Sequence, residues 1–308
     1  MTHQELREEI LRLKKEKNAL IMAHYYQRDE IQEIADFIGD SLALARQAAK
    51  TDADIIVMCG VHFMGETAKI LCPGKKVLVP DMAAGCSLAD SCDADDFRRF
   101  VEAHPGYTVI SYVNTSAAVK ALTDIVVTSG NARKIVESLP ADEKIIFGPD
   151  KNLGGYINSV ASRDMLLWQG HVHDRFSIDK IMDLKKEHPE AKILVHPECR
   201  RPLQLIADKV GSTAALLEFA EKDEAPEYIV VTESGILFEM RRKCSSKRFI
   251  PAPAEDSECQ CNECDYMKLN TLEKVYAALR DEAPEIHVDP EVAAKAIRPI
   301  ERMLELSV

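Results

Sequence analysis

The sequence contains no apolar run of the roughly 18 residues that a membrane-spanning helix needs. Its first stretch, MTHQELREEILRLKKEKN, is a charged helical pattern rather than a secretory signal, so we expect a cytoplasmic protein with no membrane partner. An excess of positive charge is also missing, because the 308 residues carry a formal net charge of -12. Nucleic acid is therefore not expected as a partner, and an anionic ligand would need a local cationic or metal-bearing pocket.

The sequence also lacks the paired cysteines of a disulfide framework or a closed zinc site. Its nine cysteines come without an export signal, which favours free thiols or metal ligands. Within CQCNEC, which begins at Cys259, one C-x-x-C pair joins Cys261 and Cys264, and no second such pair or H-x-x-x-H accompanies it, so structural zinc is weakly supported. A thioredoxin-type pair is weakly supported too, because the next helical pattern begins only near Asn270.

What the sequence does contain is a recurrence of short apolar segments at intervals of roughly 85 residues. The first segments begin at Ala19, Tyr107 and Lys192. The second are DIIVMCGV, DIVVTSGN and YIVVTESG, and the third are KKVLVPD, KIIFGPD and KRFIPAP, which we expect to correspond one to one in the three units. Amphipathic helical patterns lie between them, so each unit is predicted to be a parallel sheet with helices on both faces.

These patterns predict an α/β fold of three pseudo-symmetric α/β/α domains with parallel sheets around a central active site. The units are a helix and first α/β unit over 1–102, a second over 103–186, a third over 187–264, and C-terminal helices over 265–308 that pack back on the core. Ligands of such sheets collect beyond the carboxyl ends of the strands. The first segments end in His24 and Tyr26, Tyr112 and Asn114, and His196 and Glu198, and two of the second end near Ser129 and Glu233. Each of these groups could instead cap a helix or close a turn.

Two thiol-bearing stretches take corresponding places in this scheme. Cys86 follows the third apolar segment of the first unit in PDMAAGCSLAD, and CQCNEC follows that of the third unit. Thiolates from well-separated loops are typical of an iron-sulfur cluster, and an iron left open can act as a Lewis acid. The middle unit would then supply a third ligand.

Many segments resemble quinolinate synthase in order and spacing over nearly the whole chain, among them AHYYQ, AGCSLAD, SYVNTSAAVKA, TSGNA, HPEC, TESGILFEM and CDYMKLNTLEK. The resemblance implies a central 4Fe-4S cluster that acts as a Lewis acid. It also implies a transferase that condenses iminosuccinate with dihydroxyacetone phosphate to quinolinate, the pyridine precursor of NAD, with loss of phosphate and water. The resemblance further implies a functional link to an aspartate-oxidising enzyme.

The resemblance assigns roles residue by residue. Cys86 and Cys264 match the cluster ligands of the first and third units, and Cys259 and Cys261 are then bystanders or redox-sensitive neighbours. The candidate catalytic residues are Tyr26, Glu198 and His196. The positions that match the dicarboxylate pocket are His24, Ser41, Tyr112, Val113, Asn114, Ser129, His173, His196, Pro197, Glu198 and Thr213. Lys151, in GPDKNLG, would attract phosphate or be a solvated loop lysine.

The middle unit departs from the family pattern W-x-G-x-C-x-V-H, because this sequence reads WQGHVHDRF and lacks the cysteine. Three accounts of the third ligand stay open: the imidazole of His171, the thiol of Cys199 in HPEC, or loss of the full cluster. The last account leads to an alternative function, a non-catalytic iron-sulfur or thiol redox sensor on this scaffold. A further rival is an unrelated metal-assisted hydro-lyase, since the fold alone does not fix the substrate.

Overall fold

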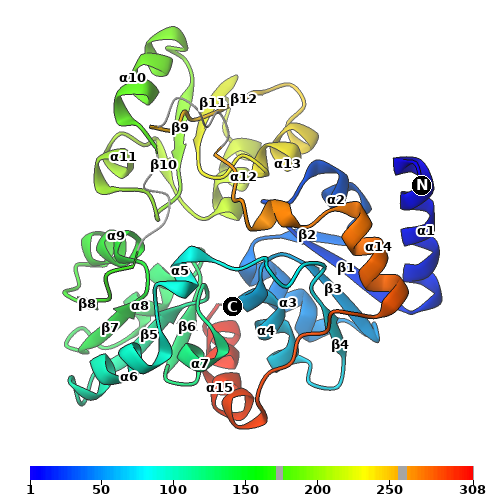
Figure 1. Cartoon of the computed structure of the whole chain (residues 1–308). Coiled ribbons are helices and arrows are strands. Elements are labelled where there is room, and N and C mark those ends of the chain that lie inside the picture. Colours follow the sequence, from blue (N-terminus) through cyan, green and yellow to red (C-terminus); the bar gives the residue numbers. More distant parts are fainter. Residues whose placement is uncertain (171–175, 256–261, 308) are drawn as a thin grey trace.

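The computed structural model describes residues 1–170, 176–255 and 262–307 (Figure 1). The first unit is a four-stranded sheet in the order β2-β1-β3-β4, and every neighbouring pair is parallel. Helices connect its strands. The elements are α1 (His3–Glu16), β1 (Ala19–His24), α2 (Asp29–Ile34), β2 (Phe37–Gly39), α3 (Ser41–Lys50), β3 (Ile55–Cys59), α4 (His62–Leu71) and β4 (Lys76–Leu78).

The second unit repeats this arrangement with a parallel sheet in the order β6-β5-β7-β8. Two helices precede its first strand. The elements are α5 (Ser87–Asp90), α6 (Ala94–Glu102), β5 (Thr108–Tyr112), α7 (Ala117–Lys120), β6 (Ile125–Val127), α8 (Ala132–Ser138), β7 (Ile145–Gly148), α9 (Lys151–Ala161) and β8 (Leu166–Leu167).

The third unit has a parallel sheet in the order β10-β9-β11-β12, and the chain ends in helices that return to the other two units. Its elements are α10 (Ile178–Glu187), β9 (Lys192–Val195), α11 (Arg201–Leu205), β10 (Lys209–Val210), α12 (Thr213–Lys222), β11 (Glu227–Val231), α13 (Ile236–Lys243) and β12 (Arg248–Pro251). The C-terminal elements are η1 (Met267–Leu269), α14 (Leu272–Asp281) and α15 (Pro290–Leu306). The predicted fold of three pseudo-symmetric α/β units is thus confirmed.

The predicted correspondence of the strand segments is wrong for the middle unit. DIVV forms β6, which pairs with the first strand on the side occupied by β2 and β10 in the other sheets. KIIF forms β7, which takes the place of β3 and β11, and the short strand β8 takes the place of β4 and β12. The strands β2, β8 and β10 have only three, two and two residues, too few to show an apolar pattern in the sequence.

One aspartate contact recurs in all three units. Just before the edge strand, a carboxylate accepts a hydrogen bond from a backbone N–H of the adjacent first strand, 15 residues earlier in each case. This bond fixes the start of the edge strand beside the first strand. The pairs are Asp36 with Ile21 (2.9 Å), Asp124 with Val109 (2.8 Å) and Asp208 with Ile193 (2.8 Å).

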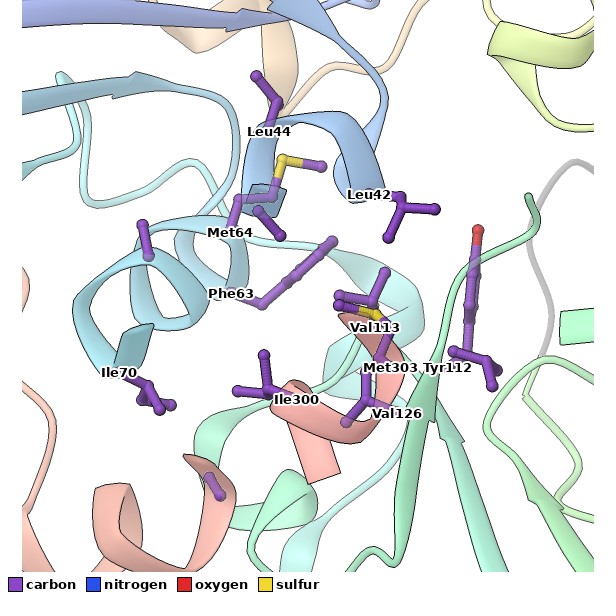
Figure 2. Packing of buried hydrophobic residues seen from close by; sticks show 14 of the residues in the cluster. Leu42, Leu44, Phe63, Met64, Ile70, Tyr112, Val113, Val126, Ile300 and Met303 are labelled. Atoms are coloured by element: carbon purple, nitrogen blue, oxygen red, sulfur yellow. The ribbon is translucent and has the colours of Figure 1, made fainter. Parts of the chain in front are cut away.

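The first and second units share one apolar core with the C-terminal helix. Figure 2 shows Met64 of α4 beside Leu44 of α3 and Phe63 on the side of Val113, and Met303 belongs to the same cluster, so distant segments pack on one another. Full burial of a side chain such as Phe63 stabilises the fold by about 1.5 to 3 kcal/mol. The third unit has cores of its own, and α14 packs on α1 in another. None of the described helices is long and apolar enough to cross a membrane.

The repeated aspartate contact can be tested at Asp124. We expect Asp124→Ala to lower the free energy of unfolding by about 1 kcal/mol, because the backbone N–H of Val109 loses its charged acceptor. The measurement is the midpoint of denaturant unfolding. Asp183→Ala is the control, since that exposed carboxylate pairs with Lys186 within one helix and such pairs contribute little. Equal shifts in both variants would show that the contact is not a special support of the sheet.

Candidate active site

The carboxyl ends of the three sheets surround a common centre (Figure 1). β1, β5 and β9 hold the same position in their sheets, and each edge strand beside them leads to a hydroxyl residue. Local sequence explains the placement, because Asp40 caps α3 by accepting from the backbone of Ala43 (3.0 Å), and Ser212 caps α12 in the same way. The equivalent residues are His24, Tyr112 and His196, then Tyr26, Asn114 and Glu198, and finally Ser41, Ser129 and Thr213.

The second and third units meet in a buried polar network. Nε2 of His196 lies 3.2 Å from Oγ of Ser129, and its Nδ1 lies 3.2 Å from a carboxylate oxygen of Glu198. The hydroxyl of Tyr112 hydrogen-bonds to Glu198 and Ser129. Burial raises the pKa of Tyr112, and the charge of Glu198 adds to the effect. The network therefore holds a carboxylate, an imidazole and two hydroxyls away from bulk water.

The first unit joins this network through Tyr26. Its hydroxyl lies 2.8 Å from Oγ1 of Thr232 and also hydrogen-bonds to Thr213, so β1 is tied to the third unit. The ring of His24 packs edge-on against that of Tyr26 at 4.5 Å between centroids. Burial raises the pKa of Tyr26, and burial, aided by His196, lowers the pKa of His24 to about 3. Tyr26 thus stays protonated and His24 stays neutral near pH 7.

The remaining pocket candidates lie at the same centre or at its border. Ser41 and Val113 line one small cavity between the first and second units. Oδ1 of Asn114 is buried and has no hydrogen-bond partner among the residues that the structure describes. The backbone carbonyl of Pro197 accepts from Gln204. His173 lies outside the described residues, so its assignment stays a prediction.

The loops that follow β4 and β12 bring two thiols into the same region. Cys86 directly precedes α5, and Cys264 precedes η1. Burial and, to a smaller extent, the nearby Cys264 thiol raise the pKa of Cys86 to about 12. Burial likewise raises the pKa of Cys264. Both thiols are soft donors of the kind that iron-sulfur clusters use, and they fit two positions of such a group.

The third thiol candidate lies elsewhere. Cys199 is fully buried in the apolar core of the third unit, and its Sγ donates a weak hydrogen bond to the carbonyl of Val231 at 3.5 Å. His171, Cys259 and Cys261 lie outside the described residues. Among residues 1–170, 176–255 and 262–307, no three His, Cys, Asp or Glu side chains form a group that could hold a metal ion. The described part of the chain therefore offers two candidate cluster ligands, Cys86 and Cys264, and their role stays a prediction.

A buried ion pair that sequence reasoning missed connects the thiol loop to the catalytic candidates. Glu233 lies 3.1 Å from Nζ of Lys268 and accepts from the backbone N–H of Cys264 at 3.1 Å. Nζ of Lys268 also donates to the carbonyl of Tyr26 at 2.9 Å. Burial raises the pKa of Glu233 to about 7, and Lys268 opposes the rise. The strand-end position of Glu233 was a signal in the sequence, whereas Lys268 had none.

The start of α9 also reaches the site. Nδ2 of Asn152 donates to the carbonyl of Glu198 at 2.9 Å, a contact between the second and third units. Lys151 beside it is half-buried at the first position of the helix. Asp150 caps the helix by accepting from the backbone of Leu153. This places Lys151 near the centre, and its role with phosphate stays a prediction.

A separate cleft contains none of the candidate site residues in its lining. It has a volume of about 500 Å³ and is bordered by α1, α2 and α13. Its charged lining is already paired, as Arg7 is with Glu33 and Arg242 is with Glu239. The convergence of strand ends, rather than this cleft, is therefore the candidate active site.

Comparison with known proteins shows the family of the chain. A family model described as quinolinate synthetase A protein matches residues 8–305. A quinolinate synthase of Chloroherpeton thalassium is 54% identical over 305 residues, covering 98% of this chain and 95% of the relative. That of Microcystis aeruginosa is 55% identical over 300 residues, covering 97% and 94%. The chain belongs to the quinolinate synthase family. The predicted resemblance to quinolinate synthase is confirmed, and the name of the family identifies its members as enzymes.

The neutral state of His24 gives this quinolinate synthase family member a testable pH dependence. Between about pH 6.5 and about pH 3 the unfolded chain binds a proton at His24 and the folded chain does not, so stability is lost as the pH falls through this window. We expect His24→Gln to make the thermal midpoint fall less steeply between pH 7 and pH 5. His287→Gln, at an exposed histidine, should give a profile parallel to the parent's. Parallel profiles for both variants would contradict a neutral buried His24.

Proposed function

We propose that the protein condenses iminosuccinate with dihydroxyacetone phosphate to quinolinate, with loss of phosphate and water. One observation carries the proposal: the buried pair of His196 and Glu198 lies close enough to Tyr26 for the charge of Glu198 to act on its hydroxyl, in a chain that matches the family model over residues 8–305. An aspartate-oxidising enzyme would supply the iminosuccinate. A cytoplasmic location stays a prediction.

The donors at the centre suit a substrate with two carboxylates. Ser41 and Thr213 are the first residues of α3 and α12, so each hydroxyl lies at a helix N-terminus with its partial positive charge. Asn114 and Ser129 add an amide and a hydroxyl without adding negative charge. This arrangement gives an acidic protein a local site for a dianion.

Cys86 and Cys264 would hold the 4Fe-4S cluster from the first and third units. Metal binding displaces the protons that burial otherwise keeps on these thiols. When bound, the cluster would supply an iron with an open position, a Lewis acid that makes loss of a hydroxyl group easier. Cys199 lies in a separate apolar core, so we no longer consider it as the third cluster ligand. Two accounts remain: His171 is the third ligand, or the full cluster is lost.

The protein's own side chains would move the protons that ring formation needs. The carboxylate of Glu198, with His196 at 3.2 Å, is the proposed acceptor of a proton from the carbon next to the imine of iminosuccinate. The protonated hydroxyl of Tyr26 is the proposed donor to a departing oxygen. The buried network would also exclude water and so strengthen these interactions.

The sensor alternative is less favoured. A thiol sensor needs reactive cysteines, but it has no use for a buried network of tyrosine, histidine and glutamate supplied by three units. The hydro-lyase alternative has no observation in its favour beyond the shared scaffold.

The decisive test is anaerobic reconstitution with iron and sulfide, followed by an assay for quinolinate from the two proposed substrates. We expect visible iron-sulfur absorbance and product. Cys86→Ala and Cys264→Ala should each lose both, whereas Cys199→Ala, the matched thiol control, should keep both. A cluster without product would support the sensor, and loss of the cluster in Cys199→Ala would restore that thiol as a ligand.

The role of Glu198 is tested by Glu198→Gln, which keeps the shape of the side chain and removes the base. We expect kcat to fall about 100-fold or more while the iron-sulfur absorbance is kept. Glu190→Gln, at an exposed position of the same unit, serves as the control. A kcat within a few-fold of the parent value would exclude Glu198 as the proton acceptor.

A further inference from the structure

A buried side-chain nitrogen braces the loop after the first strand in each of the three units. Each nitrogen donates to the backbone carbonyls that lie seven and five residues before it in the sequence, and the nitrogen of Gln32 also donates to the carbonyl of Gly235 at 3.1 Å. The contacts are Gln32 to Tyr25 (3.2 Å) and Gln27 (2.9 Å), Lys120 to Val113 (2.8 Å) and Thr115, and Gln204 to Pro197 (2.9 Å) and Cys199 (2.7 Å). The three donors come from the equivalent short helices α2, α7 and α11.

The residue between the two braced carbonyls belongs to the proposed active site in every unit. It is Tyr26 in the first unit, Asn114 in the second and Glu198 in the third. Two hydrogen bonds on either side of one residue fix its backbone, and the backbone sets where its side chain begins. The donors are thus placed to control where these three different side chains begin.

In the two glutamines the side-chain nitrogen makes hydrogen bonds, whereas the side-chain oxygen makes none within the described residues. Oε1 of Gln32 and Oε1 of Gln204 are buried and have no hydrogen-bond partner among the described residues. Their amide orientation is fixed, because the two carbonyl acceptors need the nitrogen. Lys120 is 0% exposed, lies over the ring of Phe63 at 5.4 Å and makes its two close hydrogen bonds with carbonyls. Fully buried lysines are rare without a special role.

We propose that Gln32, Lys120 and Gln204 are positioning residues, which clamp the loops that carry Tyr26, Asn114 and Glu198. The inference rests on the proposed function for the roles of those three residues. Because two units use glutamine at the same spacing, an amide is long enough to span the carbonyls, so the clamp needs the N–H donors and not the charge of Lys120.

The test uses the reconstituted full-length protein. Lys120→Met should raise the KM for iminosuccinate about 10-fold or more, because Asn114 is a binding residue, and Lys120→Gln should restore it to within a few-fold. Gln204→Met should instead lower kcat about 10-fold or more, because Glu198 moves protons. Lys185→Met is the matched control, since Lys185 also donates to two carbonyls two residues apart, those of Pro189 and Ala191, far from the site.

Amide hydrogen exchange gives a second readout that needs no activity. Exchange over residues 113–117 should rise in Lys120→Met and return to the parent level in Lys120→Gln. The clamp would be overturned if the parent is active and the Lys120→Met and Gln204→Met variants keep its kcat, KM and exchange rates. If the reconstituted parent makes no quinolinate, the proposed function is overturned. If the variants of that parent still show the expected changes in exchange, the clamp stands as a property of the loops alone.

Discussion

The site depends on a constraint of parallel sheets, in which every strand delivers its carboxyl end to the same edge. Three such edges face one centre here, so residues from distant parts of the chain come into contact, as His196 does with Ser129 at 3.2 Å. The second unit supplies Tyr112 to the network around Glu198, and the first unit supplies His24 and Tyr26, which complete the centre. No single unit could build it.

Burial at this centre decides the protonation states. Removal from water favours neutral forms, so His24 is unprotonated while Tyr26 and the Cys86 thiol keep their protons. The cost of burying polar groups is offset where they bind one another, as Tyr26 does with Thr232. The buried charged side chains around this centre include Glu198, Lys120 and the pair of Glu233 with Lys268.

The sequence predicts the three sheets because recurring β-branched segments are visible without coordinates, and the strand-end rule points to His24, Tyr112 and His196. It does not reveal β2, β8 or β10, since two or three residues carry no period, and this led to the wrong pairing of segments in the middle unit. Lys268 and Glu233 meet only through tertiary folding. Cys199 follows Glu198 directly in the sequence, and only its contact with Val231 shows that the thiol points into the core.

Pseudo-symmetry explains how one scaffold supplies different chemistry at equivalent points. The backbone at Tyr26, Asn114 and Glu198 is held by the same kind of clamp, so each side chain starts from an equivalent place. In the proposed function, the phenol would then serve as a proton donor, the amide as a neutral hydrogen-bonding group and the carboxylate as a base. Because the clamp and the strand-start aspartates act on the backbone, they leave these side chains free to differ. The repeated contacts therefore preserve geometry, and the residues between them carry the chemical differences.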